Sequence, residues 1–185
     1  MSEAAFRRES AVEYFKELVD GALSRQGLAA RELTAYYVVQ LLASFLQRRF
    51  TGGQDDTMPL ALRLGRALDS AGMRQRDSLK EIGDVALFVS GFFSDSLTRK
   101  LVDVDYYVSI GGCAYNTLSR VEDEAFSPVF AELGEKFVGF VDVLAEVSER
   151  TSCSSSAASS RMRRSKRRGS NDRSVLLRHM CVHMT

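Results

Sequence analysis

The fold is decided by the stretch SLKEIGDVALFVSGFF, which spans residues 78–93. It opens on a capping box, in which Ser78 and Glu81 are spaced to bond the first free N–H groups of a helix. Apolar residues then recur at helical spacing along one face: Leu79, Ile82, Ala86, Val89 and Phe93. The stretch therefore predicts an amphipathic helix whose front face lies in a core.

The back of this predicted helix is nearly as apolar as its front. At about 100° per residue, Asp84, Phe88 and Gly91 point away from the front face. Two interpretations follow. Either these three residues form a surface for a protein partner or a second copy of the chain, or the helix is fully internal. In the internal case Asp84 lies near the N-terminal end, where a carboxylate suits the helix dipole.

Helical spacing also predicts the elements on either side of this stretch. They cover residues 10–27, 30–48, 57–72, 103–121 and 127–149, with a second capping box at Ser10 and a Ser127-Pro128 start for the last one. No run alternates at a period of two between turn signals, which is the pattern of strands. We therefore predict an all-α protein, a bundle of about six helices.

The charge divides the chain into two unlike parts. Residues 151–185 hold 8 Lys or Arg and 1 Asp, a charge of +7, whereas residues 1–150 hold 17 basic and 23 acidic residues, a charge of −6. All 11 Phe and all 6 Tyr lie in residues 1–150. We therefore expect a helical bundle domain over residues 1–150 and a disordered, Ser- and Arg-rich basic C-terminal tail over residues 151–185.

The abruptness of this change suggests a hypothesis about the origin of the tail. Composition, charge and aromatic content all shift near residue 151, while the last predicted helix is still running. A shifted reading frame in the source DNA would produce such a change, so residues from 152 onward are hypothesised not to be the native continuation. The intact mass of protein from the natural host tests this, because a mass near 20.6 kDa would refute it.

Residues 1–150 contain no histidine, because both His179 and His183 lie in the tail. This excludes Ser-His-Asp and Cys-His catalytic sites, His-ligated haem and the Glu-x-x-His di-iron motif from the bundle. The sequence also has no G-x-x-x-x-G-K-[ST] loop and no strand leading into G-x-G-x-x-G, the motifs that bind nucleotide phosphates. We therefore expect no cofactor and no metal, and a protein that acts without catalysis.

A second group of chemically capable residues lies between residues 103 and 115. Its members are Asp103, Asp105, Tyr106, Tyr107, Gly111, Gly112, Cys113 and Tyr115. As an alternative function, they could line a small-molecule or enzymatic pocket with Asp105 as acid or base and Cys113 as ligand or nucleophile. In the competing interpretation the aspartates cap a helix, the glycines let a neighbour pack closely, and Cys113 is a small core residue.

The two adjacent tyrosines of this group cannot share a face. Tyr106 and Tyr107 diverge by about 100° on a helix. We therefore expect one of them in the core and the other at a surface that a partner can reach.

The tail carries a basic run, RMRRSKRR at residues 161–168, in which six of eight residues are basic. Such a run can contact nucleic-acid phosphates, which gives a second alternative function. It lacks the interleaved aromatic residues that stack on single strands. We therefore expect nucleic-acid binding only through the tail, if at all.

The sequence also bears on the compartment. The first residues, MSEAAFRRE, lack the apolar run of a signal peptide, and the longest apolar stretch, residues 33–46, is shorter than the roughly 20 residues that cross a bilayer. Three widely spaced cysteines give no disulfide framework. We therefore expect a cytoplasmic protein with no membrane contact.

Three segments carry a resemblance: LKEIGDVALFVSGFF at residues 79–93, VDYY at residues 104–107 and GGCAY at residues 111–115. Together they resemble an uncharacterised group of bacterial all-helical cytoplasmic proteins. The resemblance implies a bacterial, cytoplasmic origin and brings no activity or site residues with it. In such a group the chain would continue as helix after residue 150, whereas this chain turns there to Ser and Arg.

The first function that we predict from the sequence is a non-catalytic binding or regulatory module. Its contact surface would be the back of the helix over residues 78–93, together with a tyrosine of the helix over residues 103–121. Buried aromatic anchors would supply the affinity for a protein partner or a second copy.

Overall fold

The computed structural model describes residues 3–48, 58–93 and 104–162, with side chains over residues 11–45, 58–93 and 104–152. Every element in these ranges is a helix, which confirms the predicted all-α class. The helices are α1 (Glu3–Gln26), α2 (Glu32–Arg48), α3 (Leu60–Leu68), α4 (Gly72–Phe92), α6 (Val104–Val121), α7 (Ser127–Glu135) and α8 (Phe137–Met162). The predicted disorder of the tail and most of its basic run fall, from residue 163 onward, outside the described residues.

Two predicted helix starts lie inside longer helices. α1 begins at Glu3 rather than at Ser10, and α4 begins at Gly72 rather than at Ser78. Gly72 has a φ of 66°, a left-handed conformation that favours glycine, and the extended Ala71 is the N-cap residue. The Ser-x-x-Glu spacing misplaced both starts because it also occurs inside helices, where the preceding turn already binds the N–H groups.

The last predicted helix is in fact two helices. α7 begins at Ser127 as expected, but Lys136 leaves the helical conformation with φ −105° and ψ 25°. Its amine donates to the carboxylate of Glu132, one turn earlier in α7, and to the carbonyl of Ala29, which is distant along the chain; both contacts lie at the turn. α8 then continues to Met162, so helical backbone extends past Arg150 into the start of the segment predicted as tail.

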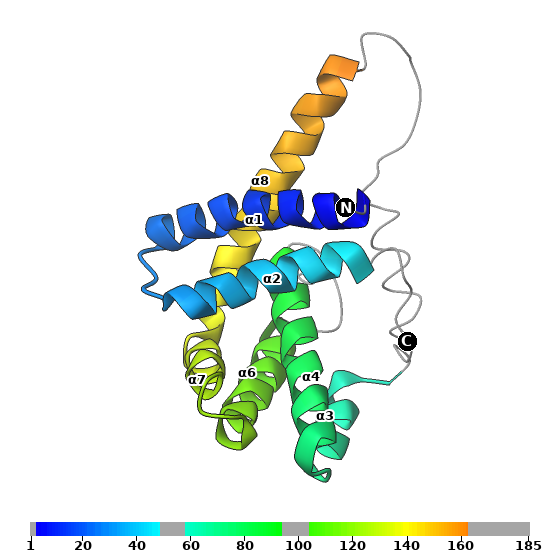
Figure 1. Ribbon diagram of the computed structural model, residues 1–185, viewed down its shortest axis with the longest axis vertical. Helices are drawn as coiled ribbons and strands as arrows, with labels where there is room; N and C mark the ends of the chain where they lie inside the picture. The colour runs from blue at the N-terminus through cyan, green and yellow to red at the C-terminus, as the bar shows by residue number, and fades with distance from the viewer. Residues whose placement is uncertain (1–2, 49–57, 94–103, 163–185) are drawn as a thin grey trace.

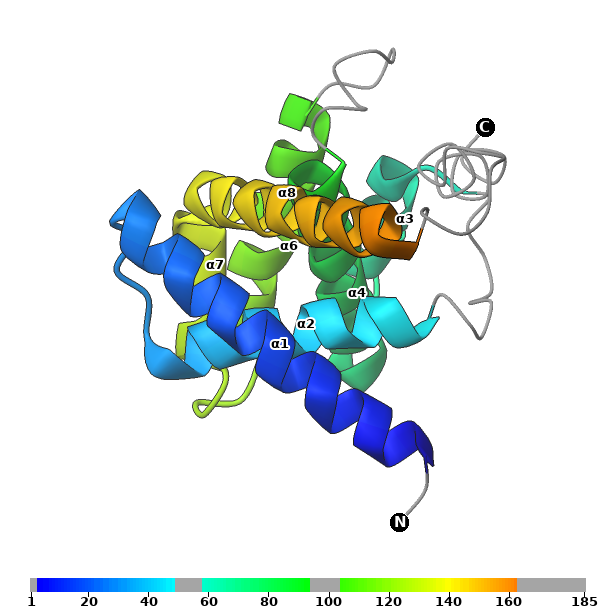
Figure 2. The same ribbon diagram turned by 90° about the horizontal axis from the view of Figure 1, so that it is seen from above.

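Helix α4 lies between α6 and α3 (Figure 1). It packs against α3, α6 and α8, while α7 packs against α6. α1 and α2 lie side by side and cover one face, and α1 also packs against α8. Seen from above, α8 crosses α6 and α4 and runs at an angle to α1 (Figure 2). A helix surrounded in this way must be apolar on more than one side.

Gly91 and Gly111 lie at close approaches between helices. A Cβ added to Gly91 of α4 would overlap the Cβ of Leu144 on α8. A Cβ on Gly111 of α6 would lie 2.5 Å from Cε2 of Phe137 and 2.9 Å from the Cβ of Ala86, closer than real Cβ contacts. Both residues are glycine because the neighbouring helices occupy that space.

Among the described residues, no helix is both long enough and apolar enough to cross a bilayer.

Candidate functional site

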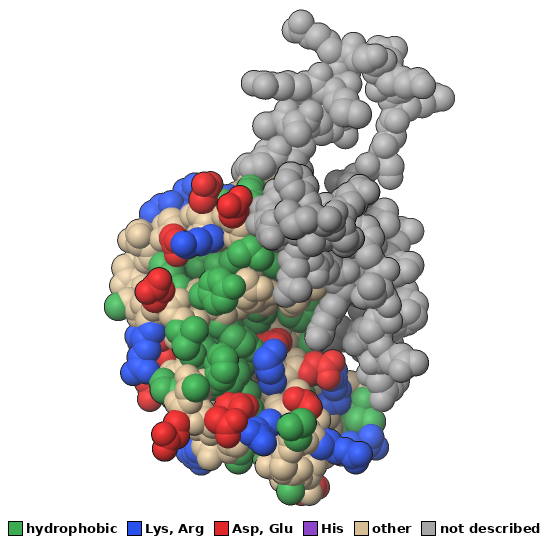
Figure 3. All heavy atoms as spheres, in the orientation of Figure 1, with side chains coloured by type: hydrophobic (Ala, Val, Ile, Leu, Met, Phe, Trp, Pro, Cys, Tyr) green, Lys and Arg blue, Asp and Glu red, His purple; other side chains and the backbone are tan. Residues whose placement is uncertain are grey.

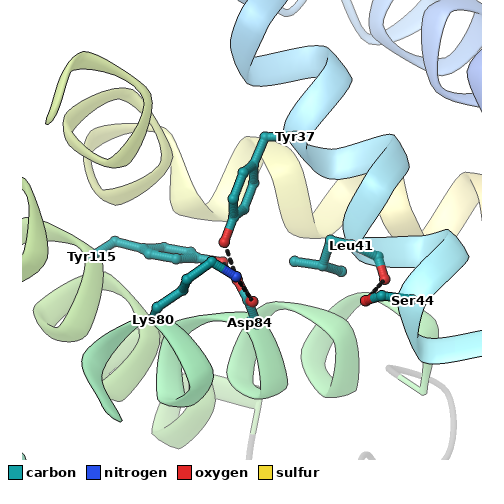
Figure 4. A network of polar contacts seen from close by, with 6 residues as sticks. All are labelled: Tyr37, Leu41, Ser44, Lys80, Asp84 and Tyr115. Atoms are coloured by element: carbon teal, nitrogen blue, oxygen red, sulfur yellow. Dashed lines mark hydrogen bonds and ion pairs between the residues drawn. The ribbon is translucent and has the colours of Figure 1, made fainter. Parts of the chain in front are cut away.

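The most elaborate polar cluster is centred on Asp84, near the middle of α4 (Figure 4). The hydroxyls of Tyr37 on α2 and Tyr115 on α6 both donate to its Oδ1 atom, over 2.6 Å and 2.8 Å. The amine of Lys80, one turn earlier on α4, lies 3.1 Å from the other oxygen, Oδ2. One carboxylate therefore joins three helices. We refer to these four residues as the Asp84 cluster.

Burial and the charge of Asp84 both raise the pKa values of the two phenols. Burial raises the pKa of both Tyr37 and Tyr115 well above the ordinary 10.0, and the adjacent charge of Asp84 raises it further. Both tyrosines are therefore protonated hydrogen-bond donors at neutral pH. The Lys80 amine also lies 5.3 Å from the centre of the Tyr37 ring, within the range of a cation–π contact.

The Asp84 cluster has its polar groups paired within the chain. The Asp84 side chain is 14% exposed, and both of its oxygens have partners. In the described part of the chain, every fully buried side-chain nitrogen and oxygen has a hydrogen-bond partner. A catalytic acid or base needs a proton-transfer partner in an accessible cavity, whereas this carboxylate is occupied by two phenols and an amine. The arrangement suits holding α2, α4 and α6 in register.

The other two residues predicted at the back of α4 also contact helices of this chain. The Phe88 ring stacks on Phe45 of α2, with ring centres 4.2 Å apart, and on Phe92 at 5.1 Å. Gly91 is buried against Leu144 of α8. The back of α4 therefore fits the internal-helix interpretation, because α2, α6 and α8 take up that face. The expected place of Asp84 near the N-terminal end of the helix is wrong, because α4 begins at Gly72 and Asp84 lies near its middle.

The structure does not bring the residues of the 103–115 group together around one hollow. Asp105 and Cys113 are exposed, while Asp103 lies outside the described residues. Gly112 has open space beside it, with the Gly134 carbonyl 3.9 Å from where a Cβ would lie, whereas Gly111 is pressed against Phe137. The acid and the thiol of the predicted pocket therefore face solvent rather than a shared cavity.

Of the adjacent tyrosines, one lies in the core as expected, whereas the other packs partly against the core instead of standing at an open surface. Tyr107 is buried in the core, and Tyr106 is half-buried. The Tyr106 hydroxyl accepts a hydrogen bond of 3.1 Å from the backbone N–H of Ala61, at the start of α3. Tyr115, which the sequence placed beside a pocket, belongs instead to the Asp84 cluster.

Among the hollows on the described surface are two that no residue of the predicted sites lines. The larger, about 910 Å³, lies between α1 and α8 and is lined by Leu18, Gln26, Asp142, Ala145, Glu146, Glu149 and Arg150. Arg25 and Gln26 of α1 bond the carboxylate of Glu146 beside it. The smaller, about 150 Å³, lies between α3 and α4.

A second buried carboxylate, Glu132 of α7, was missed by the sequence reasoning. One of its oxygens accepts hydrogen bonds from the hydroxyl of Thr34 (2.7 Å) and the backbone N–H of Arg31 (3.1 Å), at the start of α2. The other pairs with Lys136 at 2.8 Å. The Glu132–Lys136 spacing of four residues was visible in the sequence, but the partners on α2 were not, since they lie about a hundred residues away along the chain.

The described residues offer no ligand set for a metal. They contain no group of three or more His, Cys, Asp or Glu side chains placed to hold an ion. No protein-family model, curated protein or solved structure matches this chain. The function proposed below therefore rests on the geometry of the described residues.

Proposed function

We propose that this chain is a non-catalytic binding module whose contact surface is the outer face of α2. The surface is defined by Leu33 and Tyr36, which are 48% and 52% exposed. The proposal keeps the binding role predicted from the sequence but moves the contact surface from the back of α4 to α2.

The pattern of burial along α2 supports this choice. Its inner side, including Thr34, Val38 and Leu42, is fully buried. Leu33 and Tyr36 are three residues apart, so they are neighbours on the opposite side of the helix. In the orientation of Figure 1, hydrophobic side chains gather over the middle of the face that α1 and α2 cover (Figure 3). Single exposed apolar residues are ordinary, but a contiguous group marks an interaction surface more often.

The polar groups of the interior also favour a binding role over a catalytic one. The buried carboxylates of Asp84 and Glu132 are both occupied by donors of this chain. A tyrosine and a leucine on a helix are suitable anchors, because each half-exposed side chain gains about 1 kcal/mol when a partner removes the rest of it from water. The single observation that carries the proposal is the half-exposed Leu33–Tyr36 pair on a helix whose opposite side is buried in the core.

The test compares two charged variants of the full chain. Leu33→Lys together with Tyr36→Lys alters the proposed surface, and Leu62→Lys alters a residue of α3 that is 61% exposed. A photo-crosslinking side chain at residue 36 or residue 62 then reports contacts in the natural host, and sedimentation over a concentration series reports self-association. Circular dichroism confirms that the variants fold.

We expect one defined crosslinked species, a partner or a second copy, from residue 36 and none from residue 62. With the crosslinker at residue 36, Leu33→Lys should weaken this crosslink and Leu62→Lys should leave it unchanged. The double α2 variant, which has Lys at residue 36 instead of the crosslinker, should lose any self-association that sedimentation detects. The proposal is wrong if the protein sediments as a monomer and residue 36 yields no defined crosslink.

A further inference from the structure

The smaller hollow has the lining of an anion site. It is formed by Met58, Arg63 and Arg66 on the side of α3 and by Ser78 and Ile82 of α4. These helices pack side by side (Figure 1). The two arginines are three residues apart, so they lie on the same side of α3. Two guanidinium groups and one hydroxyl therefore border an apolar floor.

The two arginines differ in their ion-pair partners. The Nη2 atom of Arg63 lies 3.1 Å from Oε2 of Glu81, and the Arg63 side chain is 20% exposed. This ion pair restrains one guanidinium at the edge of the hollow. Among the described residues, no carboxylate pairs with Arg66 and no group bonds the Ser78 hydroxyl. Among the described residues, the hollow therefore has one positioned cation, one unpaired cation and one free donor.

We propose that this hollow binds a phosphate group, either as inorganic phosphate or as a small phosphate monoester. Guanidinium groups suit this ligand, because their fork of N–H donors matches the oxygens of a phosphate. The volume of about 150 Å³ limits the size. It is roughly five times the ~30 Å³ share of one water and well below the ~300 Å³ at which sites for larger ligands begin. Met58 and Ile82 leave room for a short apolar substituent on the ester.

The site is independent of the proposed α2 surface, since it lies on other helices and takes a different class of ligand. Calorimetric titration of the full chain with inorganic phosphate at constant ionic strength tests it. A parallel titration with propyl phosphate separates the two sources of the group. Its substituent is apolar, so tighter binding of this ester than of inorganic phosphate would indicate that the substituent lies against Met58 and Ile82. Sodium chloride at the same ionic strength serves as the reference salt.

Three variants make the result specific. Arg66→Gln and Ser78→Ala each remove one donor from the hollow, whereas Arg74→Gln removes an exposed arginine that does not line it. We expect saturable phosphate binding that Arg66→Gln weakens about tenfold or more, corresponding to the loss of one charge-assisted contact. Ser78→Ala should weaken it less, and Arg74→Gln should leave it unchanged. The absence of saturable binding to both phosphates, or equal weakening by Arg66→Gln and Arg74→Gln, would overturn the proposal.

Discussion

The hydroxyl of Tyr115 on α6 donates a hydrogen bond of 2.8 Å to Oδ1 of Asp84 on α4, the same oxygen that Tyr37 of α2 reaches over 2.6 Å. Phenols from two separate helices thus converge on one atom of a third. A hydrogen bond to a buried charge contributes about 1.5–3 kcal/mol, a sizeable part of the roughly 5–15 kcal/mol by which a domain is stable. The stability of the bundle should therefore depend strongly on this contact.

Replacing Tyr115 with Phe should destabilise the protein by about 1.5–3 kcal/mol, because Asp84 loses one of its donors while the ring volume stays the same. Chemical denaturation, with the free energy of unfolding taken from the midpoint and slope, measures this loss. Tyr14→Phe is the matched control, since Tyr14 is exposed and a surface change costs within about 0.5 kcal/mol. Equal losses in the two variants would show that the Asp84 contact does not stabilise the fold.

Gly83 is placed to test how closely α4 and α6 approach. A Cβ at this position would lie 2.5 Å from Cε1 of the fully buried Tyr115 ring. Gly83→Ala should therefore destabilise the protein by about 1–3 kcal/mol through overpacking, even though alanine favours a helix by up to about 1 kcal/mol over glycine.

The control for this prediction is Gly65→Ala in α3, where nothing lies within 4 Å of the added Cβ. It should stabilise the protein slightly, through helix propensity alone. Thermal unfolding of both variants gives the sign of each change in stability. A stabilising Gly83→Ala would contradict the close packing of α4 and α6.

Glu132 should give the protein a specific sensitivity to acid. Burial tends to raise the pKa of this carboxyl, but hydrogen bonds from Lys136, Thr34 and the Arg31 N–H outweigh it and lower the pKa below its usual 4.5. A lowered folded-state pKa means that the stabilisation is complete above about pH 4.5 and is lost as the pH falls through the lower folded value.

The replacement Glu132→Gln tests this dependence, because glutamine keeps the size of the side chain but cannot ionise. Unfolding free energies measured from neutral pH downward should show the parent more stable above pH 4.5, with the difference shrinking as the pH falls further. Glu135→Gln, an exposed position of the same helix, controls for the loss of one negative charge. A difference that stays constant over this range would argue against the role of Glu132.

Alkaline pH should act through the two phenols of the Asp84 cluster. Since their pKa values are raised above 10.0 by burial and by the charge of Asp84, their contribution is complete below about pH 10 and is lost as the pH rises. Ultraviolet titration should show that Tyr37 and Tyr115 ionise only when the chain unfolds. Replacing both with Phe should remove that late step, and its persistence in the double variant would assign it to other tyrosines.

Much of the helical fold follows from local pattern. The spacing of apolar residues predicts α2, α3, α4 and α6 in their approximate places, because a helix that buries one side must repeat apolar residues near every turn. Helix ends were less predictable. The capping boxes at Ser10 and Ser78 lie within helices, and the break at Lys136 is accompanied by a contact with Ala29 that no local pattern contains.

The candidate site was predictable only in part. Sequence alone selected Asp84 and Tyr115 as chemically unusual residues, but it assigned them to different surfaces, since they lie on different helices and their side chains meet only in the folded bundle. The hollow at Arg63, Arg66 and Ser78 was missed, because helical spacing relates residues of one helix and says nothing about which face of α3 meets α4.

The sequence by itself determined that this is an all-α protein with an acidic, histidine-free bundle and a basic end, since helix formation, charge and the presence of residue types are local properties. Only the tertiary structure decided how the back of α4 is used. Apolar residues and a carboxylate on a second helix face suit a partner surface and an internal helix equally well. The packing of α2, α6 and α8 around α4 makes it an internal helix. The sequence could not show this, because burial depends on neighbours that are distant along the chain.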